Sequence, residues 1–281
     1  MARTQRVRLA RTGASVLWYA AAATIAVLMV GPFLWMVATA LSSPKEAMAY
    51  PPHFIPSQLY LRNFSEAVSR APLLRTMANS TFVAASEISL NLVVSSLAAY
   101  AFSRLRFPGR DRIFVIYLSA MMIPFQVTLV PVYLEIVALK WVDNYLAIII
   151  PGGVSVWNIF LLRQFFMTIP VDYEDAARID GATRLEFLGR VLLPLSRPAL
   201  VTVGLFTFMG SWNSFIWPLI VISTPTKRLV QQGLKYWQSE RYDIVSQLMA
   251  ATTITIIPIL LVFVFAQRNL VQGMVLAGLK G

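Results

Sequence analysis

Six long stretches of the chain are almost entirely apolar, and shorter polar segments separate them. A helix needs about 20 apolar residues to cross a bilayer, because each residue adds about 1.5 Å. Five of the stretches contain no Asp, Glu, Lys or Arg, and the second contains one acid, Glu87. The pattern predicts an all-α membrane protein with a single transmembrane domain over residues 1–281. We expect its six helices at residues 14–41, 76–102, 113–134, 144–162, 199–224 and 244–267.

Composition and charge agree with a location in the membrane. Of the 281 residues 57% are hydrophobic and 13% are charged, which is about half the charged share of a soluble domain. The net charge of +11 does not indicate nucleic-acid binding, because membrane proteins concentrate Lys and Arg in their cytoplasmic loops. Basic residues crowd the segments before the first helix, between helices 2 and 3, and between helices 4 and 5. Residues 1–13, 163–198 and 268–281 are therefore expected in the cytoplasm, on the inner face of the cell membrane.

Several kinds of chemistry are not expected from this chain. It has no cysteine and one histidine, His53, so neither a thiolate site nor a histidine-based metal site is predicted. No segment matches the phosphate-binding loop Gly-x-x-x-x-Gly-Lys-Ser/Thr or the Gly-x-Ser-x-Gly elbow of hydrolases. We therefore expect no enzyme active site, no metal and no cofactor in the chain itself.

The segment between helices 4 and 5 predicts a helix–turn–helix. Asp172 is suited to cap a short helix, and Gly181 is suited to end it in the left-handed conformation. Thr183–Glu186 has the pattern of a capping box that opens a second helix. Two prolines, Pro194 and Pro198, should break that helix before the fifth membrane span.

One part of this segment's surface carries unusually small side chains, which are those of Ala176, Ala177, Gly181 and Ala182. Small residues allow close backbone approach, which suits a segment that enters a groove on another protein. The alternative is an amphipathic connector that rests on the lipid surface.

The stretch from Asp175 to Gly181 resembles the EAA loop of binding-protein-dependent ABC importer permeases, whose pattern is Glu-Ala-Ala, three residues, then Gly. Residues 98–109, 212–219 and 267–281 also resemble the carbohydrate-uptake branch of that family, and within it the MalG type. In the family this loop docks in a cleft of the ATP-binding subunit. The residues that the resemblance assigns to docking are Glu174, Asp175, Ala176, Ala177, Asp180 and Gly181. The chain departs from the pattern at Asp175, which replaces the family's Glu and is one methylene shorter.

The resemblance implies a set of partners. They are a second MalG- or MalF-like permease, two ATPase subunits that hold ATP and magnesium, and an extracytoplasmic binding protein that delivers a sugar. It also implies that the outer segment 225–243 contacts the binding protein, and the suitable side chains there are Lys227, Arg228, Trp237 and Tyr242. The alternatives are an importer for a polyol or glycerol phosphate, an ATP-independent transporter, and a membrane scaffold.

Two places in the spans are candidates for the translocation path. Glu87 lies about 16 Å from the outer end of its helix, and Asn91 follows one turn later on the same face. An acid at this depth faces either a watery path or hydrogen-bonding partners inside the bundle. Trp212 and Asn213 lie in the outer half of the fifth helix, where an aromatic ring either joins the interfacial belt or stacks on a sugar.

Overall fold

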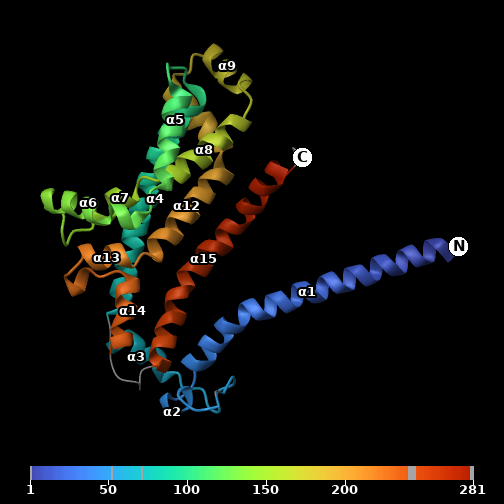
Figure 1. Ribbon diagram of the computed structural model, residues 1–281, viewed down its shortest axis with the longest axis vertical. Helices are drawn as coiled ribbons and strands as arrows, with labels where there is room; N and C mark the ends of the chain where they lie inside the picture. The colour runs from blue at the N-terminus through green and yellow to red at the C-terminus, as the bar shows by residue number, and fades with distance from the viewer. Residues whose placement is uncertain (1, 52, 71, 240–244, 279–281) are drawn as a thin grey trace. The chain divides into compact units, whose positions relative to one another are not determined.

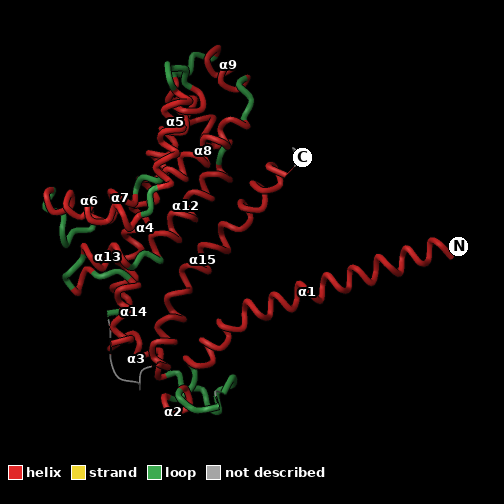
Figure 2. The backbone as a smooth tube through the Cα atoms, viewed as in Figure 1, coloured by secondary structure: helices red, strands yellow, loops and turns green. Residues whose placement is uncertain are grey.

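The computed structural model describes residues 2–51, 53–70, 72–239 and 245–278 of the chain. Across these ranges every regular element is a helix, and Figure 2 shows no strand among them. The prediction of an all-α protein is confirmed. The chain divides into two compact units, which are Met1–Ala71 with Tyr236–Ile254, and Pro72–Lys235 with Thr255–Gly281.

The first unit is built around a long apolar helix, α1 (Ala2–Ala40), drawn in blue in Figure 1. None of the most apolar window within Leu17–Ala40 is buried against the rest of the described chain. A helix that is apolar all round is suited to lipid or to another membrane protein.

A buried asparagine connects the other parts of this unit, which include α2 (Pro44–Ala47), α3 (Arg62–Arg70) and the start of α15 (Val245–Gly278). The Asn63 amide donates to the carbonyl oxygens of Ala40 and Ser42, each at 2.8 Å. Its oxygen accepts a hydrogen bond from the Ser246 hydroxyl at 3.2 Å. The end of α1 is thereby tied to α3 and α15.

The second unit packs around α4 (Leu73–Arg104), against which α8 (Val156–Thr168) and α12 (Arg197–Trp212) lie (Figure 1). Its other helices are α5 (Arg110–Ser119), η1 (Ala120–Met122), α6 (Phe125–Ala138), α7 (Leu146–Gly152), α9 (Asp172–Ile179), α10 (Arg184–Phe187), η2 (Leu188–Leu192), α11 (Leu193–Leu195), α13 (Ile216–Val221) and η3 (Pro225–Lys227). The start of α14 (Val230–Ser239) and the part of α15 from Thr255 onward also belong to it.

Three of the expected spans are broken. In the described residues four helices are long and apolar enough to cross a membrane, or up to six if each bent pair is one span. The expected helix 113–134 is two helices that meet at 99°, because Pro124 lacks an N–H and stands where the chain turns. The expected helix 144–162 is interrupted after Gly152, and the expected helix 199–224 stops at Trp212 and resumes as α13.

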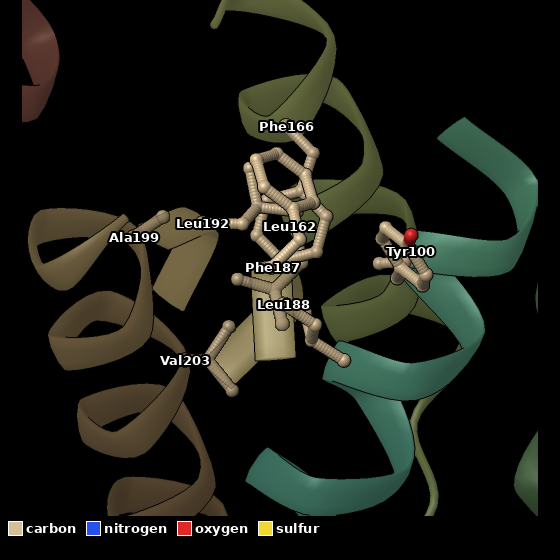
Figure 3. Close-up of a cluster of buried hydrophobic side chains, with 9 residues drawn as sticks. Tyr100, Leu162, Phe166, Phe187, Leu188, Leu192, Ala199 and Val203 are labelled. Atoms are coloured by element: carbon tan, nitrogen blue, oxygen red, sulfur yellow. The ribbon is translucent and has the colours of Figure 1, made fainter. Parts of the chain in front are cut away.

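A large apolar cluster holds the second unit together at one end (Figure 3). It joins Tyr100 of α4 and Phe166 of α8 to Val203 of α12, and all three are buried. The short helices after α9 insert Phe187 and Leu192 among them. The segment between α8 and α12 is therefore anchored in the body of the protein and is not a free loop.

Candidate functional site

The helix α9 lies at one end of the second unit, beyond α5 and α8 (Figure 1). Its first turn carries three acids, Asp172, Glu174 and Asp175, which suit the positive end of the helix dipole. Asp172 does not cap the helix as expected. It is the first helical residue, and the N-cap is Val171, which makes no side-chain cap bond.

The end of α9 has the geometry that the sequence predicts. Gly181 has a φ of +80°, in the left-handed region that glycine adopts without strain. The Gly181 N–H donates to the Arg178 carbonyl at 3.0 Å, and the Ala182 N–H donates to the Ala177 carbonyl at 2.9 Å. This pair of bonds is a Schellman motif, which satisfies carbonyls at the end of the helix.

The capping box is also present. The Glu186 N–H donates to the Thr183 hydroxyl at 3.3 Å, and the Thr183 N–H donates to the Glu186 carboxylate at 3.0 Å. These bonds hold the pKa of Glu186 below its usual value. The chain then runs through η2 and α11 and bends by 82° into α12. The bend lies between Pro194 and Pro198, as predicted.

The expected docking residues do not share one face. Asp175, Ala176, Asp180 and Gly181 are exposed, whereas Ala177 is half-buried and packs against the apolar cluster. Glu174 is buried, and its carboxylate pairs with the Arg178 guanidinium at 2.7 Å. Ala177 therefore attaches α9 to the body of the permease, Glu174 is buried with its partner on the same helix, and the exposed four form the free surface.

Apolar side chains that the sequence analysis did not single out extend this free surface. Val171 and Tyr173 are exposed at the start of α9, and Ile179 is 86% exposed at its end. Leu185 of α10 is also exposed. Each of these four side chains is open to a partner that docks on α9 and α10. The signal was present in the sequence as apolar residues on the outer side of an otherwise polar segment.

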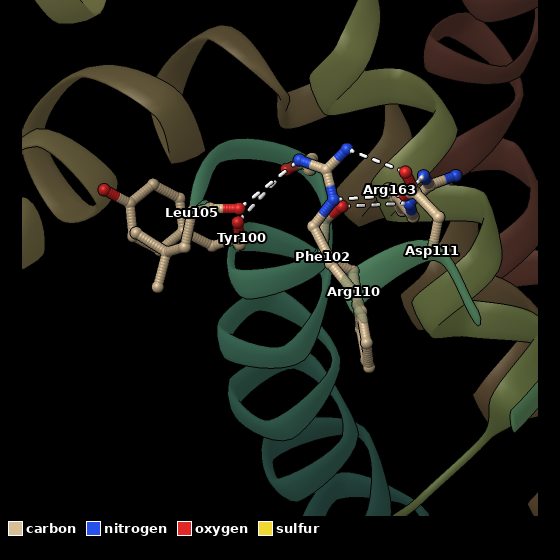
Figure 4. A network of polar contacts seen from close by, with 7 residues as sticks. Tyr100, Phe102, Leu105, Arg110, Asp111 and Arg163 are labelled. Carbon is tan, nitrogen blue, oxygen red and sulfur yellow. Dashed lines mark hydrogen bonds and ion pairs between the residues drawn. The ribbon is translucent and has the colours of Figure 1, made fainter. Parts of the chain in front are cut away.

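Two arginine side chains, Arg104 and Arg163, join α4 to α8 next to this surface, and we call their contacts the arginine lock. Arg104, the last residue of α4, donates to the carbonyls of Phe166 and Ile169 at 2.7 and 2.6 Å, where α8 ends. In the opposite direction Arg163 of α8 donates to the Phe102 carbonyl of α4 at 3.1 Å (Figure 4). Each helix thus has its terminal carbonyls satisfied by a cation from the other helix.

An ion pair extends this lock to α5. Asp111 accepts from Arg163 at 3.3 Å and from Arg110 at 3.1 Å (Figure 4). Arg110, with help from Arg163, holds the pKa of the Asp111 carboxyl below its usual value. The Arg163 guanidinium also lies 4.2 Å from the centre of the Phe114 ring. Arg163 of α8 therefore contacts two other helices, α4 and α5, at once.

The second unit also contains a cavity of about 920 Å³. It lies between α4 and the two helix breaks, after Gly152 in α7 and after Trp212 in α12. Glu87 and Asn91 both line it, so they lie together as expected, with Asn158, Thr207 and Ser211 beside them. Glu87 is buried against the backbone of Gly152, where a Cβ atom would collide with its carboxyl group.

The two residues of the Trp212–Asn213 pair have different surroundings. Asn213 lines the cavity, whereas Trp212 is 1% exposed and belongs to the core. Its ring stacks on Phe208, and its N–H donates to the Thr255 carbonyl at 3.2 Å. The expectation that Trp212 stands in the belt or the path is wrong, because its ring is packed in the core and does not line the cavity. Trp217 of α13 lines the cavity in its place.

The outer segment is held by an aspartate. Asp143 accepts from the Thr224 hydroxyl at 2.6 Å and from the Lys227 ammonium at 3.0 Å. The Thr224 bonds, followed by those from Lys227 and Ser223, hold the pKa of Asp143 well below its usual value. Lys227 is thus engaged within the chain. Arg228 is exposed, Trp237 falls in α14 with its side chain outside the described part, and Tyr242 lies outside the described residues.

Comparisons with known proteins identify the family. Residues 91–276 match the family described as "Binding-protein-dependent transport system inner membrane component". The arabinooligosaccharides transport system permease protein AraQ of Halalkalibacterium halodurans is 34% identical over 232 residues, which cover 81% of this chain and 82% of that protein. The sn-glycerol-3-phosphate transport system permease protein UgpE of Escherichia coli is 34% identical over 260 residues, covering 89% and 92%.

A solved structure has the same fold. It is the crystal structure of a bacterial ABC transporter involved in the import of the acidic polysaccharide alginate, and its matching chain superposes with a TM-score of 0.82 at 23% identity. The match covers 91% of this chain and 96% of that chain. The all-helical architecture, with its bent and broken spans, is therefore that of an importer permease. The chain belongs to the family of binding-protein-dependent inner-membrane components and is a multi-pass translocation subunit of an ABC importer.

Proposed function

We propose that this permease serves the uptake of a sugar and takes its driving force from separate ATPase subunits through α9. The observation that carries the proposal is the exposed surface of α9 and α10 on a segment anchored in the body of the protein. Such a surface suits docking in a groove, and a lipid-resting connector would not need the anchor. ATP and magnesium belong to the ATPase partners in this scheme.

The sugar assignment is supported by relatives and by the cavity. One relative is named an arabinooligosaccharides permease, and the cavity combines aromatic rings with neutral polar groups. The rival substrate is glycerol phosphate, because another relative, with the same 34% sequence identity, is named as a glycerol-3-phosphate permease. Glu87, Asn91 and Asn213 would line this chain's half of the translocation path.

The arrangement in the membrane follows from the same proposal. With α9 in the cytoplasm beside the ATPase subunits, both chain termini are cytoplasmic and the segment 225–243 faces outward. Arg228 is exposed there and suited to contact a binding protein, whereas Lys227 stabilises the segment through Asp143. A second, similar permease would complete the path.

Closure of the ATPase dimer would move α9, and the cavity would change the side to which it opens. ATP drives this change only if it binds more tightly to one conformation, because equal affinity for both shifts nothing. The lock between α4 and α8 lies directly before α9 and suits the transfer of that movement into the membrane.

Reconstitution with the ATPase subunits, a second permease and the binding protein tests the proposal. We expect ATP-dependent accumulation of a neutral oligosaccharide such as arabinotriose in vesicles, and ATPase activity that rises when the loaded binding protein is added. Accumulation without ATP, or a complete lack of accumulation of any sugar with a correctly assembled complex, would contradict it.

A further inference from the structure

The cavity between α4, α8 and α12 has an unusual balance of polar groups. One acid, Glu87, lines it, and no lysine, arginine or histidine is found among its described lining residues. Its other amides and hydroxyls are all neutral, and they come from Asn91, Thr128, Ser155, Asn158, Thr207, Ser211, Asn213 and Ser214. A phosphate or carboxylate would meet no cation here, and its hydration would be lost without replacement.

Two of these amides carry polar atoms that have no partner. The Asn158 amide nitrogen donates to the Asn91 oxygen at 2.9 Å and to the Thr207 hydroxyl at 3.1 Å. The Ser95 hydroxyl donates to the same Asn91 oxygen at 3.0 Å. The Asn91 nitrogen and the Asn158 oxygen, however, are buried and make no hydrogen bond. Leaving such groups unpaired is unfavourable, so two of them in one cavity wall point to a missing ligand.

This conclusion does not depend on how the amides are oriented. If the oxygen and nitrogen of both amides exchange places, the Ser95 and Thr207 hydroxyls reverse their roles and the same contacts remain. One donor and one acceptor are then still left over, now the Asn158 nitrogen and the Asn91 oxygen. A hydroxyl group both donates and accepts, so a hydroxyl-rich molecule satisfies both atoms.

Aromatic rings complete the lining. Trp157 and Trp217 line the cavity with Phe125, Phe206 and Phe215. The apolar faces of sugar rings pack against such side chains, and a volume of about 920 Å³ lies within the range of small-molecule sites. A cavity that pairs aromatic faces with neutral amides suits an uncharged sugar better than a phosphorylated one.

We propose that the cavity is a solute-binding site in this chain itself, that Asn91 and Asn158 contact solute hydroxyls there, and that the site selects uncharged polyhydroxylated solutes over anionic ones. The inference rests on the proposed function, which it deepens by naming the residues and the solute class. The two buried amide atoms become available when the side chains rotate toward an arriving hydroxyl. Selection by the permease then adds to selection by the binding protein.

The sequence contains no cysteine, so one introduced cysteine gives this chain a single thiol whose labelling reports on the cavity. A Ser214→Cys variant places one thiol in the cavity wall, and Thr226→Cys places one on the exposed outer segment as a matched control. Each is prepared in the assembled complex without binding protein and labelled with a maleimide. The probes are arabinotriose, N,N′-diacetylchitobiose and glycerol 3-phosphate.

We expect the two neutral sugars to slow labelling of Ser214→Cys and glycerol 3-phosphate to leave it unchanged, with Thr226→Cys unaffected by all three. When Asn158→Ala is added to Ser214→Cys, the sugar concentration that halves the labelling rate should rise about tenfold, because one hydrogen bond to the sugar is lost. Protection by glycerol 3-phosphate, or no protection by either sugar, overturns the inference.

These outcomes are separate from those of the proposed function. If the complete complex accumulates a sugar while the thiol is never protected, the permease transports sugar without this site and only the inference fails. If Asn158→Ala prevents assembly, protection in the unmutated Ser214→Cys complex still decides the question.

Discussion

At the scale of single residues, Gly181 has a backbone conformation that few other residues adopt cheaply. Its φ of +80° closes the Schellman motif after α9, and a Cβ atom there would meet nothing. Within the permease, substitution by valine therefore acts only through the backbone, at a cost of about 1–2 kcal/mol. We expect Gly181→Val to weaken ATPase binding about tenfold or more, measured by titrating ATPase subunits onto the purified permease.

Gly189 supplies the matched control. A Cβ atom there also meets nothing, but its φ is not positive. Gly189→Val should bind the ATPase subunits as the unmodified chain does. Equal binding by both variants would show that the turn after α9 plays no part in docking.

The two adjacent alanines of α9 should respond differently, because only one is free. Ala176 is exposed, so Ala176→Trp should leave the melting temperature unchanged and block docking. Ala177 packs against the apolar cluster, so Ala177→Trp should overpack it and destabilise the permease by about 1–3 kcal/mol. Thermal unfolding and ATPase binding of the two variants separate these effects. A destabilised Ala176→Trp would contradict the assignment of faces.

Glu87 is expected to act through hydrogen bonding more than through its charge, because its carboxyl group is buried beside neutral polar groups. Glu87→Gln should retain most transport, whereas Glu87→Leu should lower the transport rate about tenfold. Leucine leaves a buried polar neighbour without its hydrogen-bond partner, which costs about 1–3 kcal/mol of free energy. Initial uptake rates in vesicles measure this. The exposed Glu135→Leu is the control, and wild-type uptake by Glu87→Leu would make Glu87 incidental.

At the scale of elements, the arginine lock joins α8 to α4 just before α9. Arg104→Gln removes the charged bonds to the Phe166 and Ile169 carbonyls, each of which contributes about 1.5–3 kcal/mol. We expect the variant to bind ATPase subunits normally but to transport less solute for each ATP hydrolysed. The ratio of uptake to phosphate release is the measurement.

Arg106→Gln is the control for this experiment, because Arg106 is exposed two residues further along the chain. It should keep the ratio of the unmodified permease. If Arg104→Gln keeps that ratio too, the lock only stabilises the fold and does not transmit movement.

At the scale of the whole molecule, the proposed function takes the energy for transport from ATPase subunits outside the chain. No segment matches a phosphate-binding loop. The purified chain should therefore release phosphate from ATP at the background rate, and addition of ATPase subunits should raise it. Robust hydrolysis in a preparation free of other subunits would contradict the division of labour proposed above.

The sequence by itself determined the features that depend on local chemistry. Hydropathy predicts the apolar segments, because crossing a bilayer requires long runs of apolar residues. Gly181, the capping box at Thr183–Glu186 and the bend at Pro194–Pro198 follow from the backbone preferences of those residues. The loop pattern from Asp175 to Gly181 identified the family for the same reason, since its residues are close together in the chain.

Only the tertiary structure decided which side of each element is covered. Ala176 and Ala177 are identical and adjacent, yet one is exposed and the other packs against the apolar cluster, whose members come from helices far apart in the chain. Trp212 lies in the core because its ring packs on Phe208 and its N–H meets the Thr255 carbonyl, 43 residues further along the chain. Asn91 and Asn158 are 67 residues apart, and their hydrogen bond exists only because α8 packs on α4. Such neighbours are set by long-range packing, which local preferences do not encode.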